Sequence, residues 1–137
     1  MSYIYLASPY SSDYGDNPNL PNMEGFAQLM EDRFLQAEAC AAKLLKEGQH
    51  IHSPIVHCHA LAKKYDLPKD VEYWWSYNSS MIAGARGFAV LKLPGWDESK
   101  GVLKEIDYFQ SLHPNSTLHP IQWIEPEEFL GAAYGEA

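Results

Sequence analysis

The sequence has few cysteines, few basic residues and no long apolar run. Its two cysteines, Cys40 and Cys58, form no Cys-x-x-Cys motif, so neither a disulfide framework nor a cysteine-based zinc site is expected. No stretch approaches the roughly 18 apolar residues that span a bilayer, and the first residues lack the basic start and apolar stretch of a signal peptide. We therefore expect a cytoplasmic protein with no membrane partner.

Acidic residues outnumber basic residues in the sequence. The chain has 10 Lys and Arg against 18 Asp and Glu, which gives a formal net charge of -8. A nucleic acid polymer is not an expected partner, because proteins that coat one need clustered Lys and Arg to replace the counterions of the phosphates. A small anion remains compatible with this charge, since backbone N–H groups and hydroxyls at a helix N-terminus can hold one phosphate.

Short β-forming runs alternate with helix patterns along the 137 residues. Strands are expected at residues 3–7, 50–56, 88–93 and 118–124, helices at residues 23–47, 71–84 and 99–112, a long loop at residues 11–22 and a helical tail around residues 126–133. This order predicts one doubly wound, Rossmann-like or flavodoxin-like α/β domain over residues 1–137. Its sheet should be mostly parallel, with about four or five strands and helices on both faces.

The segment after the third expected strand carries the clearest chemical pattern. Ser99 suits the N-cap of a helix, and the small Gly101 in the first turn lets an anion approach the N–H groups at the positive end of the helix dipole. Glu105 lies four residues after Gly101, so the two share one helix face roughly 5–6 Å apart. One helix could thus hold a 5′-phosphate and aim a carboxylate at the sugar, where it would attack or stabilise an oxocarbenium-like centre. The alternative is that Ser99 only caps the helix and Glu105 is solvated.

Two motifs in this order resemble a known family. Residues Tyr5-Leu6-Ala7-Ser8-Pro9-Tyr10, followed by Ser99-x-Gly101-x-x-x-Glu105, resemble the nucleoside 2-deoxyribosyltransferase-like superfamily. It includes the transferases, the deoxynucleoside 5′-monophosphate N-glycosidases and the CMP hydrolases. The Ser53-Pro54-x-x-His57 pattern, with Trp74 and the Pro-Gly-Trp-x-x-Ser-x-Gly-x-x-x-Glu block, is similar to a bacterial and phage branch of it.

The resemblance implies a nucleotide site at the strand ends, no metal, no cofactor, and a homodimer or homotetramer. It implies that Glu105 is the nucleophile or stabilising carboxylate and that Tyr5 orients Glu105 or the sugar. It also implies that Ser99 and Gly101 hold the 5′-phosphate. Ser8 and Pro9 would fall in the loop that wraps the nucleotide.

Asn78 departs from the family pattern. Relatives carry an acidic residue on the second helix that handles the leaving base or a sugar hydroxyl, and Asn78 stands at the matching position. An amide can hydrogen-bond a base or a hydroxyl but cannot act as general acid or base at neutral pH. This departure leaves open a weakened enzyme or a relative that only binds nucleotides.

Further side chains have two interpretations each. His52, His57 and His59 have a spacing that could suit a metal, but no carboxylate or thiolate completes the set, and base recognition by His57 or an ordinary loop histidine is favoured. Arg33 is either a support for the phosphate or a site carboxylate, or a solvated helix residue. Trp74 could stack on a base.

The other two tryptophans considered are Trp75 and Trp96. Trp74 and Trp75 point to different sides of a helix, so at most one of them faces the site and the other suits a subunit interface. Trp96 is as well explained as a loop anchor as by a ligand contact.

The favoured function is cleavage of the N-glycosidic bond of a nucleoside 5′-monophosphate, by hydrolysis rather than transfer. A nucleotide sensor of the same fold is the alternative that Asn78 favours. A purely structural oligomer ranks last, because it would leave Tyr5, Ser99 and Gly101 unexplained as a set. The base and the sugar stay open.

Overall fold

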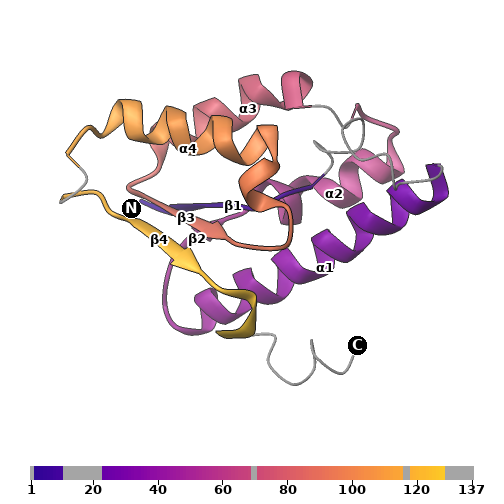
Figure 1. Ribbon diagram of the computed structural model, residues 1–137, viewed down its shortest axis with the longest axis horizontal. Coiled ribbons are helices and arrows are strands. Elements are labelled where there is room, and N and C mark those ends of the chain that lie inside the picture. Colours follow the sequence, from indigo (N-terminus) through magenta and orange to yellow (C-terminus); the bar gives the residue numbers. More distant parts are fainter. Residues whose placement is uncertain (1, 11–22, 69–70, 116–117, 129–137) are drawn as a thin grey trace.

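The computed structural model describes residues 2–10, 23–68, 71–115 and 118–128. Within these residues, four strands form one sheet in the order β2-β1-β3-β4, and every neighbouring pair is parallel. The strands are β1 (Ile4–Ala7), β2 (Ile51–His52), β3 (Gly87–Leu91) and β4 (Ile121–Ile124). The predicted α/β fold with a parallel sheet is confirmed (Figure 1).

Helices cover both faces of the sheet. Helix α1 (Met23–Lys46) covers one face, and α3 (Val71–Gly84) and α4 (Lys100–Leu112) cover the other (Figure 1). Helix α2 (Pro54–Lys64) packs beside α1, and the described residues also form two 3-10 turns, η1 (Trp96–Glu98) and η2 (Pro126–Glu128). None of the described helices is both long and apolar enough to cross a membrane.

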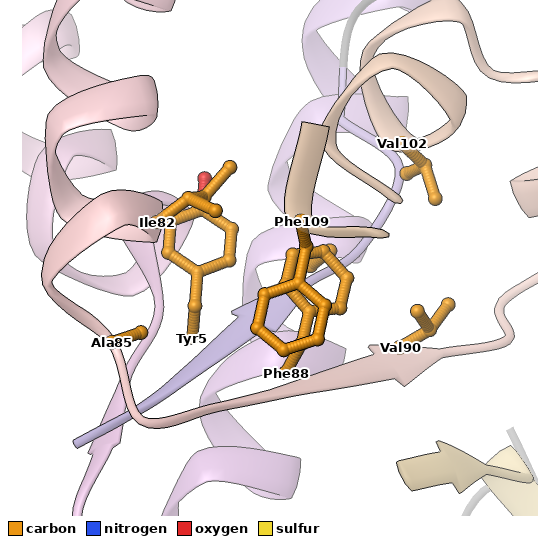
Figure 2. Close-up of a cluster of buried hydrophobic side chains, with 8 residues drawn as sticks. Tyr5, Ile82, Ala85, Phe88, Val90, Val102 and Phe109 are labelled. Atoms are coloured by element: carbon orange, nitrogen blue, oxygen red, sulfur yellow. The ribbon is translucent and has the colours of Figure 1, made fainter. Parts of the chain in front are cut away.

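Side chains that alternate along β1 and β3 build an apolar core on each face. The core under α3 and α4 contains Tyr5, Ala7, Ile82, Ala85, Phe88, Val90, Val102 and Phe109 (Figure 2). The core under α1 contains Leu6, Cys40, Ala41, Leu44, Ala89, Leu91, Leu93 and Ile124. Strands buried on both faces are typical of parallel sheets. Tyr5 brings a hydroxyl into the first core, and a buried hydroxyl needs a hydrogen-bond partner.

The main difference from the sequence prediction follows β2. A strand is predicted over residues 50–56, but the strand ends at His52 and α2 begins at Pro54. Ser53 caps this helix, because its Oγ accepts a hydrogen bond from the Val56 N–H at 3.2 Å, and proline suits a first helical turn. His57 and His59 therefore lie on a helix and do not share a strand face.

The other predicted elements agree closely with the structure. Helix α3 matches at both ends, and α1 ends one residue early, before Gly48. Gly48 has φ +88°, and its N–H donates to the Leu45 carbonyl at 3.0 Å, which is the glycine end that the sequence predicts. Strand β4 starts three residues later than predicted. The predicted loop at 11–22 and residues 129–133 of the tail lie outside the described residues.

Candidate functional site

A parallel sheet of this kind is expected to bind ligands at the carboxyl ends of β1 and β3. The two strands are neighbours, but the chain continues from β1 toward α1 on one face and from β3 toward α4 on the other (Figure 1). In such sheets, ligands bind between the loops that follow the two strands. Ser8 and Pro9 begin the first of these loops, and Pro94 and Gly95 lie in the second.

A hydrogen bond joins Tyr5 to Glu105 inside the core under α3 and α4. The Tyr5 hydroxyl donates to Glu105 Oε2. Strand β1 holds the Tyr5 ring against Phe88 with a centroid distance of 5.5 Å (Figure 2), and α4 presents Glu105 from its second turn. Only 7% of Glu105 is exposed, so the alternative of a solvated side chain is wrong. The structure brings together two of the residues predicted for the catalytic site.

Burial sets the protonation of this pair. It raises the pKa of Glu105 to about 7, and the hydrogen bond from Tyr5 acts in the opposite direction. Burial first, and then the Glu105 carboxylate, raise the pKa of Tyr5 well above 10, so Tyr5 remains a neutral donor. Both protonation states of Glu105 are therefore within reach near neutral pH. A buried carboxyl in this state is typical of sites where a carboxylate meets a developing positive charge or a proton.

Ser99 caps α4 as predicted. Its Oγ accepts a hydrogen bond from the Val102 N–H at 3.3 Å, and its residue surface is 1% exposed. The hydroxyl is therefore engaged in the cap. Gly101 is half-buried in the first turn, one turn before Glu105. A phosphate at this helix start would be held by backbone N–H groups around Gly101, with Ser99 shaping the turn.

Ser8 and Pro9 are buried directly after β1. The Ser8 Oγ is shielded from solvent and has no hydrogen-bond partner among the described residues. A buried hydroxyl without a partner is uncommon and marks a place where water or a ligand supplies one. This is compatible with the predicted place of Ser8 beside a nucleotide.

Arg33 ties the two loops together. It is 6% exposed, so the alternative of a solvated arginine is wrong. One guanidinium nitrogen, Nη1, donates to the Tyr10 carbonyl at 2.9 Å, and Nη2 donates to the Pro94 carbonyl at 3.3 Å. Arg33 thus sets the distance between the loop after β1 and the loop after β3.

The residues predicted on α2 and α3 lie at different depths. The Asn78 Oδ1 is buried and has no partner among the described residues, whereas His57 is exposed and its ring is nearly parallel to that of Tyr77 at 6.4 Å. The Trp74 indole N–H donates to the Pro68 carbonyl at 2.7 Å, which anchors it to the start of α3. Asn78 thus presents a shielded oxygen without a partner among the described residues, whereas the polar nitrogen of Trp74 is hydrogen-bonded.

The remaining tryptophans have packing roles. Trp75 meets the Tyr108 ring at 5.3 Å, and the Lys104 ammonium lies 4.4 Å from its ring centre, so it links α3 to α4. Trp96 meets the Trp123 ring at 5.5 Å. This contact supports the interpretation of Trp96 as a loop anchor.

Sequence reasoning missed a chain of hydrogen bonds on the α1 and α2 side. The Tyr10 hydroxyl lies 2.6 Å from His59 Nδ1, and His59 Nε2 lies 2.9 Å from Glu31 Oε1. Because a carboxylate only accepts, His59 Nε2 carries a proton and donates it to Glu31. The Phe34 ring stacks on His59 at 4.3 Å. The helical spacing of Glu31 and Phe34 is the sequence signal that could have indicated this chain of hydrogen bonds. The signal is incomplete, because His59 comes from α2 and Tyr10 from the segment after β1.

The described ranges contain no group of three or more His, Cys, Asp or Glu side chains arranged to hold an ion. His57 and His59 point to different surroundings on α2, and His59 is already bonded to Glu31. His52 lies on the same face of the sheet as Tyr5, with ring centres 6.2 Å apart.

The parallel sheet with helices on both faces places the protein among doubly wound α/β proteins, and the Tyr5–Glu105 hydrogen bond lies inside its core under α3 and α4. Residues 2–119 match the family described as "Domain of unknown function (DUF1937)". The chain therefore belongs to the DUF1937 family. No curated protein matches the sequence.

Proposed function

We propose that this protein cleaves the N-glycosidic bond of a nucleoside 5′-monophosphate, with Glu105 as the carboxylate that meets the sugar C1′. The observation that carries the proposal is the buried hydrogen bond between Tyr5 and Glu105. Burying a carboxyl group in an apolar core is unfavourable. Such a group is commonly retained where chemistry needs it.

In the proposed first step, Glu105 attacks C1′. A bond forms between a Glu105 carboxylate oxygen and C1′, and the C1′–N bond breaks. Its electron pair leaves with the base, which takes a proton from water. Tyr5 stays hydrogen-bonded to the other carboxylate oxygen and fixes its direction. Water then releases the sugar phosphate in hydrolysis, or a second base does so in transfer.

The raised pKa of Glu105 suits this step. With a pKa of about 7, Glu105 can be ionised near neutral pH, and the positive charge that develops at the sugar favours the ionised form further. The desolvated carboxylate gains more from that charge than a solvated one would, because the surroundings screen less. The cost of burying Glu105 is thereby offset in the transition state.

Gly101 and Ser99 support nucleotides over nucleosides as substrates. Gly101 precedes Glu105 by one helical turn, so a phosphate at the start of α4 would lie roughly 5–6 Å along the helix from the carboxylate. That span is comparable to the separation of a 5′-phosphate from C1′. Ser8 and Asn78 offer buried oxygens for hydroxyl or amino groups of the same ligand.

The test is release of free base from a panel of ribo- and deoxyribonucleoside monophosphates, followed by chromatography. We expect base from at least one of them, and we expect Glu105→Ala to lower the rate by at least about a thousandfold. Activity that is unchanged in Glu105→Ala contradicts the role of Glu105. The same panel names the base and sugar.

A second candidate, a nucleotide sensor, is favoured by Asn78. An amide cannot transfer a proton where the resembling family has an acid. A sensor would show a raised melting temperature with a monophosphate but no base release. If Asn78→Asp released base where the natural chain did not, the protein would be a weakened enzyme.

We also propose that the protein is a cytoplasmic homodimer or homotetramer that acts without metal or cofactor. The side chains of Tyr65, Tyr73 and Trp123 are each exposed and are of the aromatic kind that contacts between copies commonly bury. Light scattering after size exclusion gives the mass of the assembly. A mass equal to 15.5 kDa would exclude both oligomers.

A further inference from the structure

His52 is placed beside the proposed reacting pair by the register of the sheet. It is the last residue of β2, and it pairs with Tyr5 of β1. In a parallel ladder, residues paired in this way point to the same face, so His52 lies under α3 with Tyr5. The two ring centres are 6.2 Å apart, and the Tyr5 hydroxyl is bonded to Glu105.

The half-buried His52 imidazole has four aromatic rings around it, and one of its nitrogens has no partner among the described residues. The rings of Tyr3, Tyr5, His57 and Tyr77 lie 5.9 to 6.2 Å from its centre. Its Nε2 is shielded from solvent and has no hydrogen-bond partner among the described residues. Buried polar atoms are nearly always hydrogen-bonded, so this nitrogen points to a water or ligand atom that the site receives.

Asn78 provides a second, independent atom of the same kind. Its Oδ1 is also shielded and lacks a partner in the described part of the chain. Asn78 lies one turn before Ile82, which packs against Tyr5 in the core, and next to Tyr77, whose ring contacts His52. Two shielded atoms without a partner among the described residues thus come from elements on the same side of the sheet as the Tyr5–Glu105 pair, one from β2 and one from α3.

We infer that His52 is a catalytic residue of the proposed reaction, the general base that activates water against the glycosyl–Glu105 intermediate. The inference rests on the proposed function. Asn78 cannot supply a base, and a neutral imidazole with a free nitrogen can. Burial and the neighbouring His57 lower the pKa of His52, so the ring is in the neutral form that a base requires at pH 7.

The step is balanced as follows. Water oxygen forms a bond to C1′, and the bond between C1′ and the Glu105 carboxylate oxygen breaks. The water proton passes to His52 Nε2, so the products are the sugar 5-phosphate with a C1′ hydroxyl, the Glu105 carboxylate and protonated His52. The imidazolium then loses its proton to solvent, and the neutral ring is restored.

The experiment compares His52→Gln and His52→Phe with the natural chain on the monophosphate that releases base fastest. His52→Phe keeps a ring for Tyr3, Tyr5 and Tyr77 to pack against, and His52→Gln keeps a polar group. His50→Gln is the matched control, because His50 is an exposed histidine two residues earlier. Circular dichroism and thermal unfolding verify that each variant is folded. Base release is followed in the first turnover and at steady state, with and without sodium azide.

We expect both His52 variants to release a burst of about one base per chain and then to turn over at least about a hundredfold more slowly than the natural chain. Azide should restore steady-state base release, because it attacks C1′ without losing a proton. His50→Gln should behave as the natural chain does.

Two results would overturn the inference while the proposed function stands. One is steady-state turnover in both variants within threefold of the natural chain, which would mean that His52 Nε2 only holds a structural water. The other is slow turnover with no burst and no response to azide. If the natural chain releases no base from any monophosphate, the proposed function itself fails, and the inference fails with it.

Discussion

Two tyrosine hydroxyls are linked to acidic side chains in this protein, on opposite sides of the sheet. Under α3 and α4, Tyr5 donates to Glu105, which is buried and whose pKa is raised to about 7. On the α1 and α2 side, Tyr10 bonds to His59, and His59 bonds to Glu31, which is partly exposed. The His59 hydrogen bond, with the His59 and Lys63 charges, lowers the pKa of Glu31.

The two acidic side chains differ in which protonation state the folded protein favours. The surroundings of Glu31 favour its charged form, as expected of a structural link. The surroundings of Glu105 disfavour its charged form, so the carboxylate opposes folding at neutral pH. Groups that oppose folding are retained where function needs them. The comparison therefore supports the role proposed for Glu105 and favours a scaffolding role for Glu31.

The largest expected effect is on stability. The pKa of Glu105 is about 7 in the folded protein and has its ordinary value of 4.5 in the unfolded chain, so ionisation favours the unfolded state, and stability is lost as the pH rises from 4.5 through 7. This difference corresponds to roughly 3 kcal/mol above pH 8. We expect Glu105→Gln to unfold in urea with a free energy about 3 kcal/mol higher than the natural chain at pH 8.5, and to differ by less than about 1 kcal/mol at pH 4.5. An equal difference at both pH values would contradict this.

Arg33 tests whether the two loops depend on one side chain. Arg33→Met removes the donors to the Tyr10 and Pro94 carbonyls but keeps much of the apolar stem. We expect a loss of about 2 kcal/mol in the free energy of unfolding, because hydrogen bonds from a charged donor are the stronger kind. Lys43→Met is the control, since it removes an exposed ion pair with Glu47. It should cost less than about 1 kcal/mol.

Tyr5→Phe tests whether the Tyr5 hydrogen bond sets the pKa of Glu105 and, through it, the rate. The variant removes the hydrogen bond that lowers the pKa of Glu105, so this pKa should rise and less carboxylate should be present at pH 7. We expect base release to fall about tenfold at pH 7 and the acid limb of the pH–rate profile to move to higher pH. An unshifted acid limb would show that a different group controls the rate.

The smallest effect on stability and activity is expected for the Tyr10–His59 hydrogen bond, on the α1 and α2 side of the sheet. Tyr10→Phe removes the hydrogen bond between the Tyr10 hydroxyl and His59 Nδ1, which should lower the free energy of unfolding by about 1 kcal/mol. Base release should stay within threefold of the natural rate. A loss of activity in a folded Tyr10→Phe protein would assign this chain of hydrogen bonds to the site.

Sequence periodicity predicted most of the fold because local signals agreed with the tertiary structure. The apolar stripe and Gly48 predict α1, and Ser99 predicts the start of α4. Ser53-Pro54 was misread because the same residues suit a strand end and a helix start. The choice depends on how α2 packs beside α1, which no local pattern contains.

The site was predicted in part. The sequence predicts Glu105 from its spacing to Gly101 and from motif resemblance, and Tyr5 from the resemblance alone, and the structure joins the two over a separation of 100 residues. The burial of Arg33 and the partners of His59 were missed, because both depend on segments that meet only in the folded chain. His52 was considered only as a metal ligand. Its unused nitrogen becomes visible once β2 is paired with β1.

The most direct test of the central claim compares base release by Glu105→Gln and Glu31→Gln on the same monophosphate at pH 7. Both variants replace a carboxylate with an amide of similar shape. We predict that Glu105→Gln loses at least about a thousandfold in rate, whereas Glu31→Gln stays within threefold of the natural chain. Base release that survives in Glu105→Gln, or that disappears in a folded Glu31→Gln protein, would contradict the account.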